Sequence, residues 1–156
     1  MGRHPIPIVL VMVTHGGDVL LIRRNKEPYK GYWTFVGGKL ENDETITEAS
    51  VREAKEETGL DVEFREIKAV FHERLKEGEN LNFSGIIFLT HAEAPTDKFT
   101  ESDEGELRWV KMDSLDEMRM IPQDRWMGKN FFDKSVNTIH FVVEEKNGEV
   151  NGFREV

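Results

Sequence analysis

The first forty residues alternate between apolar runs and short glycine-containing segments. Residues 8–13 and 19–22 are apolar and rich in β-branched side chains, and a glycine turn at residues 16–18 separates them. Two such runs around a short glycine turn are typical of a β-hairpin. A third run, residues 33–36, predicts a short strand that stops at the glycine pair 37–38, because paired glycines punctuate regular structure. The chain therefore begins as a hairpin followed by one more strand.

The rest of the pattern mixes strands and helices. Apolar runs predict further strands at residues 67–75, 81–91, 107–111, 138–143 and 150–153. The pair Asn147-Gly148 predicts a hairpin turn between the last two. Short helices are expected at residues 114–118 and after Pro122. Because no internal repeat or linker is visible, the order of elements predicts one mixed α+β domain over residues 1–156.

A longer helix is expected at residues 46–58. Thr45, followed three residues later by Glu48, forms the capping-box pattern of a helix start. Gly59 stands where a left-handed residue commonly follows a helix end. Local signals therefore bound this helix on both sides.

Three acidic residues lie on one side of this helix. At about 100° per residue, Glu53, Glu56 and Glu57 fall on one side of the helix. Nearer the start of the helix, the same side carries small and apolar side chains. Stacked like charges at this spacing cost about 0.2–0.5 kcal/mol per pair even on an exposed helix. Hard divalent cations prefer carboxylate oxygens, and Mg²⁺ often shares its shell with substrate phosphates. The stripe is therefore either a solvated face of a glutamate-rich chain or a metal site.

Composition narrows the classes of function. The chain has 156 residues and a formal net charge of −9, from 30 acidic and 21 basic residues. This acidic balance argues against stable polynucleotide binding and against binding to anionic membranes, since both need excess Lys and Arg. The lack of cysteine excludes disulfides, thiolate metal sites and cysteine nucleophiles. The N-terminal apolar run is too short to span a membrane and lacks a cleavage site, so a cytoplasmic location is expected.

The segment around the acidic stripe resembles a known motif. Residues 38–60 read GKLENDETITEASVREAKEETGL. This is similar to the Nudix box: glycine, five residues, Glu, seven residues, Arg-Glu, an aliphatic residue, any residue, Glu-Glu, any residue, glycine and an aliphatic residue. The matching positions are Gly38, Glu44, Arg52, Glu53, Glu56, Glu57, Gly59 and Leu60. Only Ala54 departs mildly from this motif of the Nudix hydrolases, because a larger aliphatic side chain is usual there.

The resemblance extends along nearly the whole chain. Arg23, residues 35–39, the loop 101–104, the strand 107–110 and residues 153–156 look like their counterparts in the MutT-related 8-oxo-dGTP diphosphatases. That group implies an α/β/α sandwich with a mixed β-sheet between helices, which agrees with the α+β order of elements. It also implies a hydrolase that cuts nucleoside triphosphates to the monophosphate and pyrophosphate.

By the same resemblance, the acidic residues bind metal and activate water. The expected metal ligands are the Gly37 carbonyl and the side chains of Glu53, Glu56, Glu57 and Glu104. Mg²⁺ is the expected cation, and Mn²⁺ is a possible substitute. Glu53 is the first choice for the base that deprotonates water, with Glu104 and Glu57 as alternatives. The choice depends on which acid lacks a direct metal bond, because a bound cation lowers the pKa of its ligands.

The resemblance also assigns roles around these acids. Arg52 is expected to orient them, Gly38 to let the backbone approach closely, and Glu44 to pair with basic groups at the helix entrance. Arg23 and Lys39 resemble phosphate-facing cations of the family.

By the same resemblance, recognition of the base is expected from residues near the third strand and in the loop after the fifth. The residues concerned are Thr34, Ile121, Gln123 and Asp124. Asp124 matches a family carboxylate that hydrogen-bonds a purine edge. Thr34 stands where the mammalian 8-oxo-dGTP enzyme has an amide side chain, and Ile121-Pro122-Gln123 stands where that enzyme has an aromatic residue and an acid. Stacking from Trp126 is an alternative.

The leading hypothesis is a Mg²⁺-dependent nucleotide pyrophosphohydrolase that sanitises the nucleotide pool. Its expected partner is a small nucleotide, without a membrane or a stable polynucleotide, and it would act as a monomer or homodimer. One alternative keeps the chemistry but takes another nucleoside diphosphate derivative, such as a dinucleotide, a nucleotide sugar or an RNA 5′ end. The other alternative is a non-catalytic Nudix-like binding module, which usually lacks some of the motif acids.

Overall fold

The computed structural model describes residues 4–132, 138–146 and 149–155, the last two ranges by the course of their backbone. The strands are β1 (Ile6–His15), β2 (Asp18–Arg24), β3 (Trp33–Lys39), β4 (Glu63–Glu77), β5 (Asn80–Glu93), β6 (Gly105–Lys111), β7 (Thr138–Lys146) and β8 (Glu149–Glu155). The helices are α1 (Ile46–Thr58), the 3₁₀ helix η1 (Met112–Glu117) and α2 (Pro122–Phe131). No helix in the described ranges is long and apolar enough to cross a membrane.

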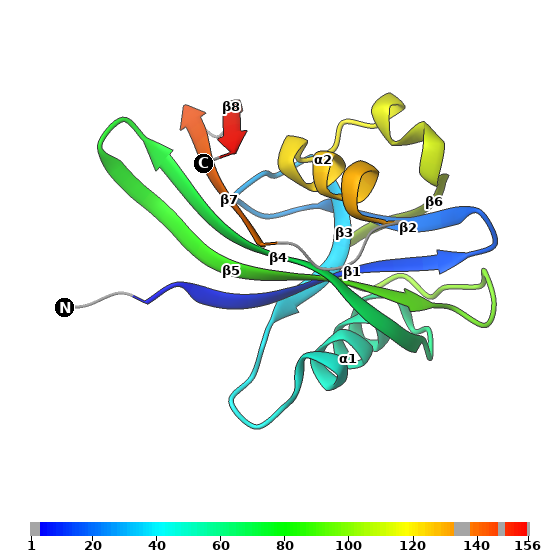
Figure 1. The fold of residues 1–156 in the computed structure, drawn as a ribbon. Helices are drawn as coiled ribbons and strands as arrows, with labels where there is room; N and C mark the ends of the chain where they lie inside the picture. Colours follow the sequence, from blue (N-terminus) through cyan, green and yellow to red (C-terminus); the bar gives the residue numbers. More distant parts are fainter. Residues whose placement is uncertain (1–3, 133–137, 147–148, 156) are drawn as a thin grey trace.

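The strands form one mixed sheet between helices. Their order is β6-β2-β3-β1-β5-β4-β7-β8. The pairs β1–β5 and β4–β7 are parallel and the others are antiparallel. Helix α1 covers one face, and α2 with η1 covers the other (Figure 1). This confirms the expected α+β sandwich with a mixed sheet.

Two apolar layers follow from this arrangement, one on each face of the sheet. Along β1, Leu10 and Met12 belong to the layer that packs against α2, while Val9 and Val11 belong to the layer against α1. Successive side chains of a strand point to opposite faces. Because both faces are covered, β1 reads as a continuous apolar run.

The local signals for α1 are confirmed by its geometry. Thr45 accepts a hydrogen bond from the Glu48 backbone, and the Glu48 side chain accepts one from the Thr45 backbone. Gly59 has φ 74°, in the left-handed region that glycine favours. The helix runs over the predicted residues. The first hairpin is also confirmed, as β1 and β2 pair around residues 16–17.

The predicted end of the third strand is wrong. Strand β3 continues through Gly37 and Gly38, which pair with Leu10 and Val9 of β1. A Cβ atom on Gly37 would lie 2.1 Å from the Val9 carbonyl oxygen, so glycine is needed here because the two strands approach closely, and not because the chain turns.

Other elements also differ from their predicted bounds. Several strands are longer than predicted, and the short helix expected at 114–118 is the 3₁₀ helix η1. The predicted turn at residues 147–148 lies outside the described residues.

Candidate active site

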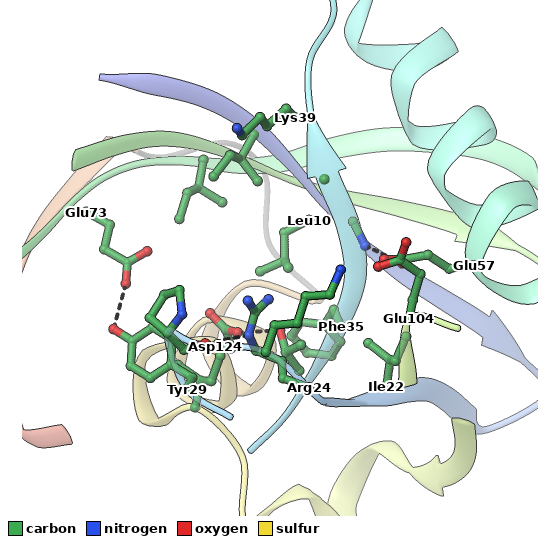
Figure 2. A pocket seen from close by; sticks show the side chains of 18 of the residues that line it. Leu10, Ile22, Arg24, Tyr29, Phe35, Lys39, Glu57, Glu73, Glu104 and Asp124 are labelled. Carbon is green, nitrogen blue, oxygen red and sulfur yellow. Dashed lines mark hydrogen bonds between the residues drawn. The ribbon is translucent and has the colours of Figure 1, made fainter. Parts of the chain in front are cut away.

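One cavity of about 330 Å³ brings together most of the residues that sequence analysis selected. Glu57 and Glu104 lie side by side at one end, and Glu73 and Tyr29 lie at the other (Figure 2). We call these the carboxylate end and the closed end. The backbone of β3 runs past the carboxylate end, and the start of α2 contributes to the closed end.

Glu57 is the member of the helical stripe that lines the cavity. Its Oε2 atom accepts a hydrogen bond of 2.9 Å from the backbone N–H of Gly37. Burial raises the pKa of Glu57 to about 8, and the negative charges of Glu53 and Glu104 act in the same direction. Metal-free Glu57 therefore holds a proton near neutral pH, which a cation binding there would displace.

Glu53 lies against the backbone of β3 and does not line the cavity itself. A Cβ atom on Gly38 would come within 2.4 Å of a Glu53 carboxylate oxygen. Gly38 is therefore needed to leave room for that carboxyl group. Burial raises the pKa of Glu53, an ion pair with Arg52 acts against this shift, and the charges of Glu56 and Glu104 add to it.

Arg52 connects the acids to the helix entrance. Its Nη1 donates to Glu53 Oε1 at 2.8 Å and to Glu56 Oε2 at 3.1 Å. Its Nε and Nη2 donate to the two oxygens of Glu44 at 2.9 and 2.6 Å, and Nη2 also donates to the Lys39 carbonyl. Such a bidentate arginine–carboxylate pair fixes direction as well as charge. The pKa of Glu44 is lowered by its hydrogen bond to Arg52.

The charges of the predicted metal ligands affect one another's pKa values, but the side chains do not converge on a single metal position. Among the residues that the structure describes, no three His, Asp or Glu side chains are close enough together to hold a metal ion. Arg52 contacts one oxygen of Glu53 and one of Glu56. Burial, and after it repulsion from neighbouring acids, raises the pKa of Glu57 and Glu53. A divalent cation would offset that repulsion, and carboxylate oxygens suit a hard cation. By this chemistry, Glu53, Glu56, Glu57 and Glu104 could hold one.

Asp124 lies at the closed end, in the first turn of α2. It is buried, and its Oδ2 accepts a hydrogen bond of 2.6 Å from Thr34 Oγ1 on β3. Burial raises the pKa of Asp124 to about 7, and the charge of Glu73 adds to the shift. The structure thus joins two of the expected base-recognition residues, 90 positions apart in the chain, by a direct hydrogen bond.

Glu73 is a site residue that sequence analysis missed. It is buried on β4, and Oε1 accepts hydrogen bonds from Tyr29 Oη at 3.3 Å and from Gln123 Nε2 at 2.5 Å. Gln123 Nε2 also donates to Tyr29 Oη at 3.0 Å. Burial raises the pKa of Glu73, and the two donors act against the shift. The sequence did contain a signal for this residue. Glu73 lies two residues from both Phe71 and Leu75, so in an alternating strand its side chain is on the same buried face as theirs.

Two adjacent arginines lie differently around the cavity. Arg24 lines it, and its positive charge lowers the pKa of Glu57, Glu73 and Asp124. Arg23, the predicted phosphate contact, lines a more open neighbouring pocket instead, and its Nε donates to the Gly31 carbonyl at 3.4 Å. Sequence alone could not decide which arginine faces the cavity, because neighbouring residues of a strand point to opposite faces.

The remaining candidates divide between the cavity and the core. Lys39, Gly38 and Ile121 line the cavity. Trp126 packs against the Phe131 ring at 5.6 Å between ring centres and does not line the cavity. Phe83 of β5 is an aromatic lining residue that sequence analysis missed.

Comparison with known proteins gives consistent results. A NUDIX domain model matches residues 2–150. The uncharacterised Nudix hydrolase YvcI of Bacillus subtilis is 32% identical over 107 residues, 68% of this chain and 66% of that protein. The oxidized purine nucleoside triphosphate hydrolase of Danio rerio is 30% identical over 118 residues, 75% of this chain and 73% of that protein.

Solved structures agree with the sequence relatives. The MutT protein of Bacillus halodurans superposes with a TM-score of 0.78 at 26% identity, over 96% of this chain and 97% of that one. The similarity to some sequence relatives is more limited, since the matched part spans 40% of an ADP-ribose pyrophosphatase of Methanocaldococcus jannaschii. With the family model matched over residues 2–150, the chain belongs to the Nudix hydrolases, enzymes that act on phosphoric anhydride bonds.

Proposed function

We propose that this protein is a Mg²⁺-dependent nucleoside triphosphate pyrophosphohydrolase that releases a nucleoside monophosphate and pyrophosphate. The observation that carries this proposal is one cavity with carboxylates at one end, the cations Arg24 and Lys39 on its walls, and buried hydrogen-bonding groups at the other end. Its volume of about 330 Å³ is in the range of small-molecule sites. A nucleotide has the matching order of groups, with phosphates at one end and a base at the other.

The carboxylate end is proposed to perform the chemistry. Glu53, Glu56, Glu57, Glu104 and the Gly37 carbonyl would hold Mg²⁺ or Mn²⁺. When bound, the cation supplies charge for the phosphates and acidity for water. Glu53 would take the proton from the attacking water, with Glu104 and Glu57 as alternatives, and Arg52 would keep Glu53 in place.

The remaining residues are proposed to bind the substrate. Lys39 and Arg24 would contact the phosphates, and Arg23 would contribute charge from the neighbouring pocket. The base would lie at the closed end among Thr34, Ile121, Gln123 and Asp124. The oxidised-purine hydrolase among the relatives supports an 8-oxo-dGTP diphosphatase-like role in sanitising the nucleotide pool, which would be carried out in the cytoplasm, where that pool is used.

A second candidate keeps the same reaction but changes the substrate to another nucleoside diphosphate derivative. The ADP-ribose pyrophosphatase of Methanocaldococcus jannaschii, 40% identical over 68 residues, is the observation that favours it. In that case the products would be two monophosphates and no pyrophosphate.

Product analysis over a substrate panel separates the two. Purified protein with Mg²⁺ would be given dGTP, 8-oxo-dGTP, dATP, dCTP, ADP-ribose and a nucleotide sugar, and products would be resolved by chromatography. We expect pyrophosphate from purine triphosphates, and Asp124→Ala should raise KM for these more than for dCTP. Faster cleavage of ADP-ribose than of any triphosphate would overturn the proposal in favour of the second candidate.

A further inference from the structure

At the closed end of the cavity, the protein offers a bound molecule more hydrogen-bond acceptors than donors. The side-chain donors of Thr34, Tyr29 and Gln123 are already engaged with protein acceptors. Thr34 donates to Asp124, Tyr29 donates to Glu73, and the amide nitrogen of Gln123 donates to both Glu73 and Tyr29. An ionised carboxylate has two oxygens and about four lone-pair positions. When Glu73 and Asp124 are ionised, what these residues retain for a bound molecule is therefore accepting capacity.

The orientation of the Gln123 amide follows from Glu73. A carboxylate accepts hydrogen bonds, so the amide must turn its nitrogen toward Glu73 Oε1 and its oxygen away. Gln123 is 1% exposed, and its Oε1 is a buried acceptor that has no hydrogen-bond partner among the described residues. Buried polar atoms in folded proteins are nearly always paired. The orphan acceptor is a sign that a donor belongs near this end of the cavity.

The charges around the closed end point the same way. Glu73 and Asp124 are each 5% exposed, and the charge of Glu73 adds to the effect of burial in raising the pKa of Asp124. Burial keeps the Tyr29 hydroxyl protonated by raising its pKa, so it remains a donor to Glu73. Arg24 lies beside Asp124, offsetting part of the negative charge, and its Nε donates to the Pro28 carbonyl (Figure 2). A bound edge of N–H groups would offset more of it.

We propose that Glu73 is a specificity-determining residue, whose carboxylate acts with Asp124 and Gln123 to select a base edge that carries two adjacent N–H donors. A guanine-type edge, with its ring N–H beside an exocyclic amino group, meets this requirement. Hypoxanthine keeps the ring N–H but lacks the amino group. The inference rests on the proposed function in assuming that the base occupies the closed end.

This role is separate from the recognition of base oxidation. Guanine and 8-oxoguanine carry the same ring N–H and amino donors, so Glu73 would favour both over hypoxanthine without distinguishing between them. A base that turns an acceptor toward the closed end would leave Gln123 Oε1 without a donor and would add no hydrogen bond to Glu73 or Asp124, and an unpaired buried acceptor weakens binding strongly.

The test compares nucleotides that differ by one amino group. In the wild type, kcat/KM for dGTP should exceed that for dITP by about tenfold or more, the size expected for one hydrogen bond to a buried charged group. In Glu73→Gln the ratio should fall to within about threefold of unity, through a higher KM for dGTP with little change in kcat. Glu77→Gln, an exposed acid on the same strand, is the matched control and should keep the wild-type ratio.

Binding of the monophosphates makes the test independent of turnover. Calorimetry with dGMP and dIMP should show the same preference in the wild type and its loss in Glu73→Gln. Melting curves would check folding. If Glu73→Gln does not fold, Glu73→Asp takes its place: the shorter side chain keeps the carboxylate but moves it away from the base, so the ratio should be intermediate. Equal binding of dGMP and dIMP by the wild type, or an equal loss for both in a folded variant, would overturn the role of Glu73. Preference for dGMP without hydrolysis of any triphosphate would leave Glu73 standing and refute the proposed function.

Discussion

The two ends of the cavity are built by different parts of the chain. At the carboxylate end, Glu57 lines the cavity. Glu53 and Glu56 lie on the same helix, where Arg52 donates a hydrogen bond to each of them. At the closed end, the hydrogen bonds to Glu73 join residues 44 and 50 positions apart, and the bond between Gln123 and Tyr29 joins residues 94 apart. The proposed chemistry therefore depends on local structure, whereas the proposed recognition depends on the whole sheet.

The two ends also differ in solvent contact. The Glu56 side chain is 58% exposed and that of Glu53 is 12% exposed, so water reaches part of this group. Glu73, Asp124 and Gln123 are all buried. Repulsion between exposed acids is screened by water and salt, whereas a buried unpaired acceptor is not compensated by solvent. Changes at the carboxylate end should therefore affect rate, and changes at the closed end should affect substrate choice and stability.

Removal of metal should give the largest effect, because it disables the carboxylate end as a whole. After dialysis against EDTA, hydrolysis of the best substrate should fall to background, and added Mg²⁺ should restore it. Binding of dGMP at the closed end, followed by calorimetry, should persist without metal. Full turnover in excess chelator would contradict the assignment of the acidic residues.

Substitution of one acid should have the next largest effect. Glu53→Gln should lower kcat by at least about 10²-fold, as expected on losing a general base or a metal ligand. Glu63→Gln, an exposed acid outside the cavity, should leave kcat unchanged, and melting curves would check folding of both variants. A near-normal kcat in Glu53→Gln would transfer the role to Glu104 or Glu57.

At the closed end, the titration of Asp124 should be visible in stability. The pKa of Asp124 is about 7 in the folded protein against an ordinary value of 3.8. Between these pH values the folded state holds a proton that the unfolded state has released, so this group makes the protein less stable as pH rises to about 7. Asp124→Asn, which keeps an acceptor for Thr34, should be more stable than the wild type by about 2–4 kcal/mol at pH 8.

The control for that measurement is pH itself. At pH 4 the carboxyl group is protonated in the folded wild type, so the two proteins should differ little in urea-induced unfolding. A difference in the free energy of unfolding that stays constant from pH 4 to pH 8 would show that Asp124 does not titrate in this range.

The smallest effect is expected for an aromatic residue that was a candidate for base stacking. Trp126 packs against Phe131 and lies outside the cavity lining. Trp126→Phe should therefore change the ratio of kcat/KM for 8-oxo-dGTP and dGTP by less than about twofold, since a residue without substrate contact contributes equally to both. A larger change in this ratio would restore the stacking hypothesis.

Sequence reasoning succeeded where neighbouring residues contain the information. The first hairpin and the bounds of α1 were predicted because turn and capping signals act within a few residues. The end of β3 was predicted wrongly, since Gly37 and Gly38 look like a turn unless the approach of Val9 on β1 is known. Glycine has several structural uses, and the sequence does not state which one applies.

By itself, the sequence determined the acidic helix, its capping, the strand pattern and the family to which the chain belongs. These properties depend on spacing within short segments: hydrophobic periodicity indicates the strands, and the capping residues and the motif positions are read directly from the sequence. Only the tertiary structure decided that Arg24 and not Arg23 lines the cavity, and that Glu73, Gln123 and Tyr29 meet at its closed end. The physical reason is that strand register and sheet order bring distant residues together, and both depend on how all the strands pack against the helices.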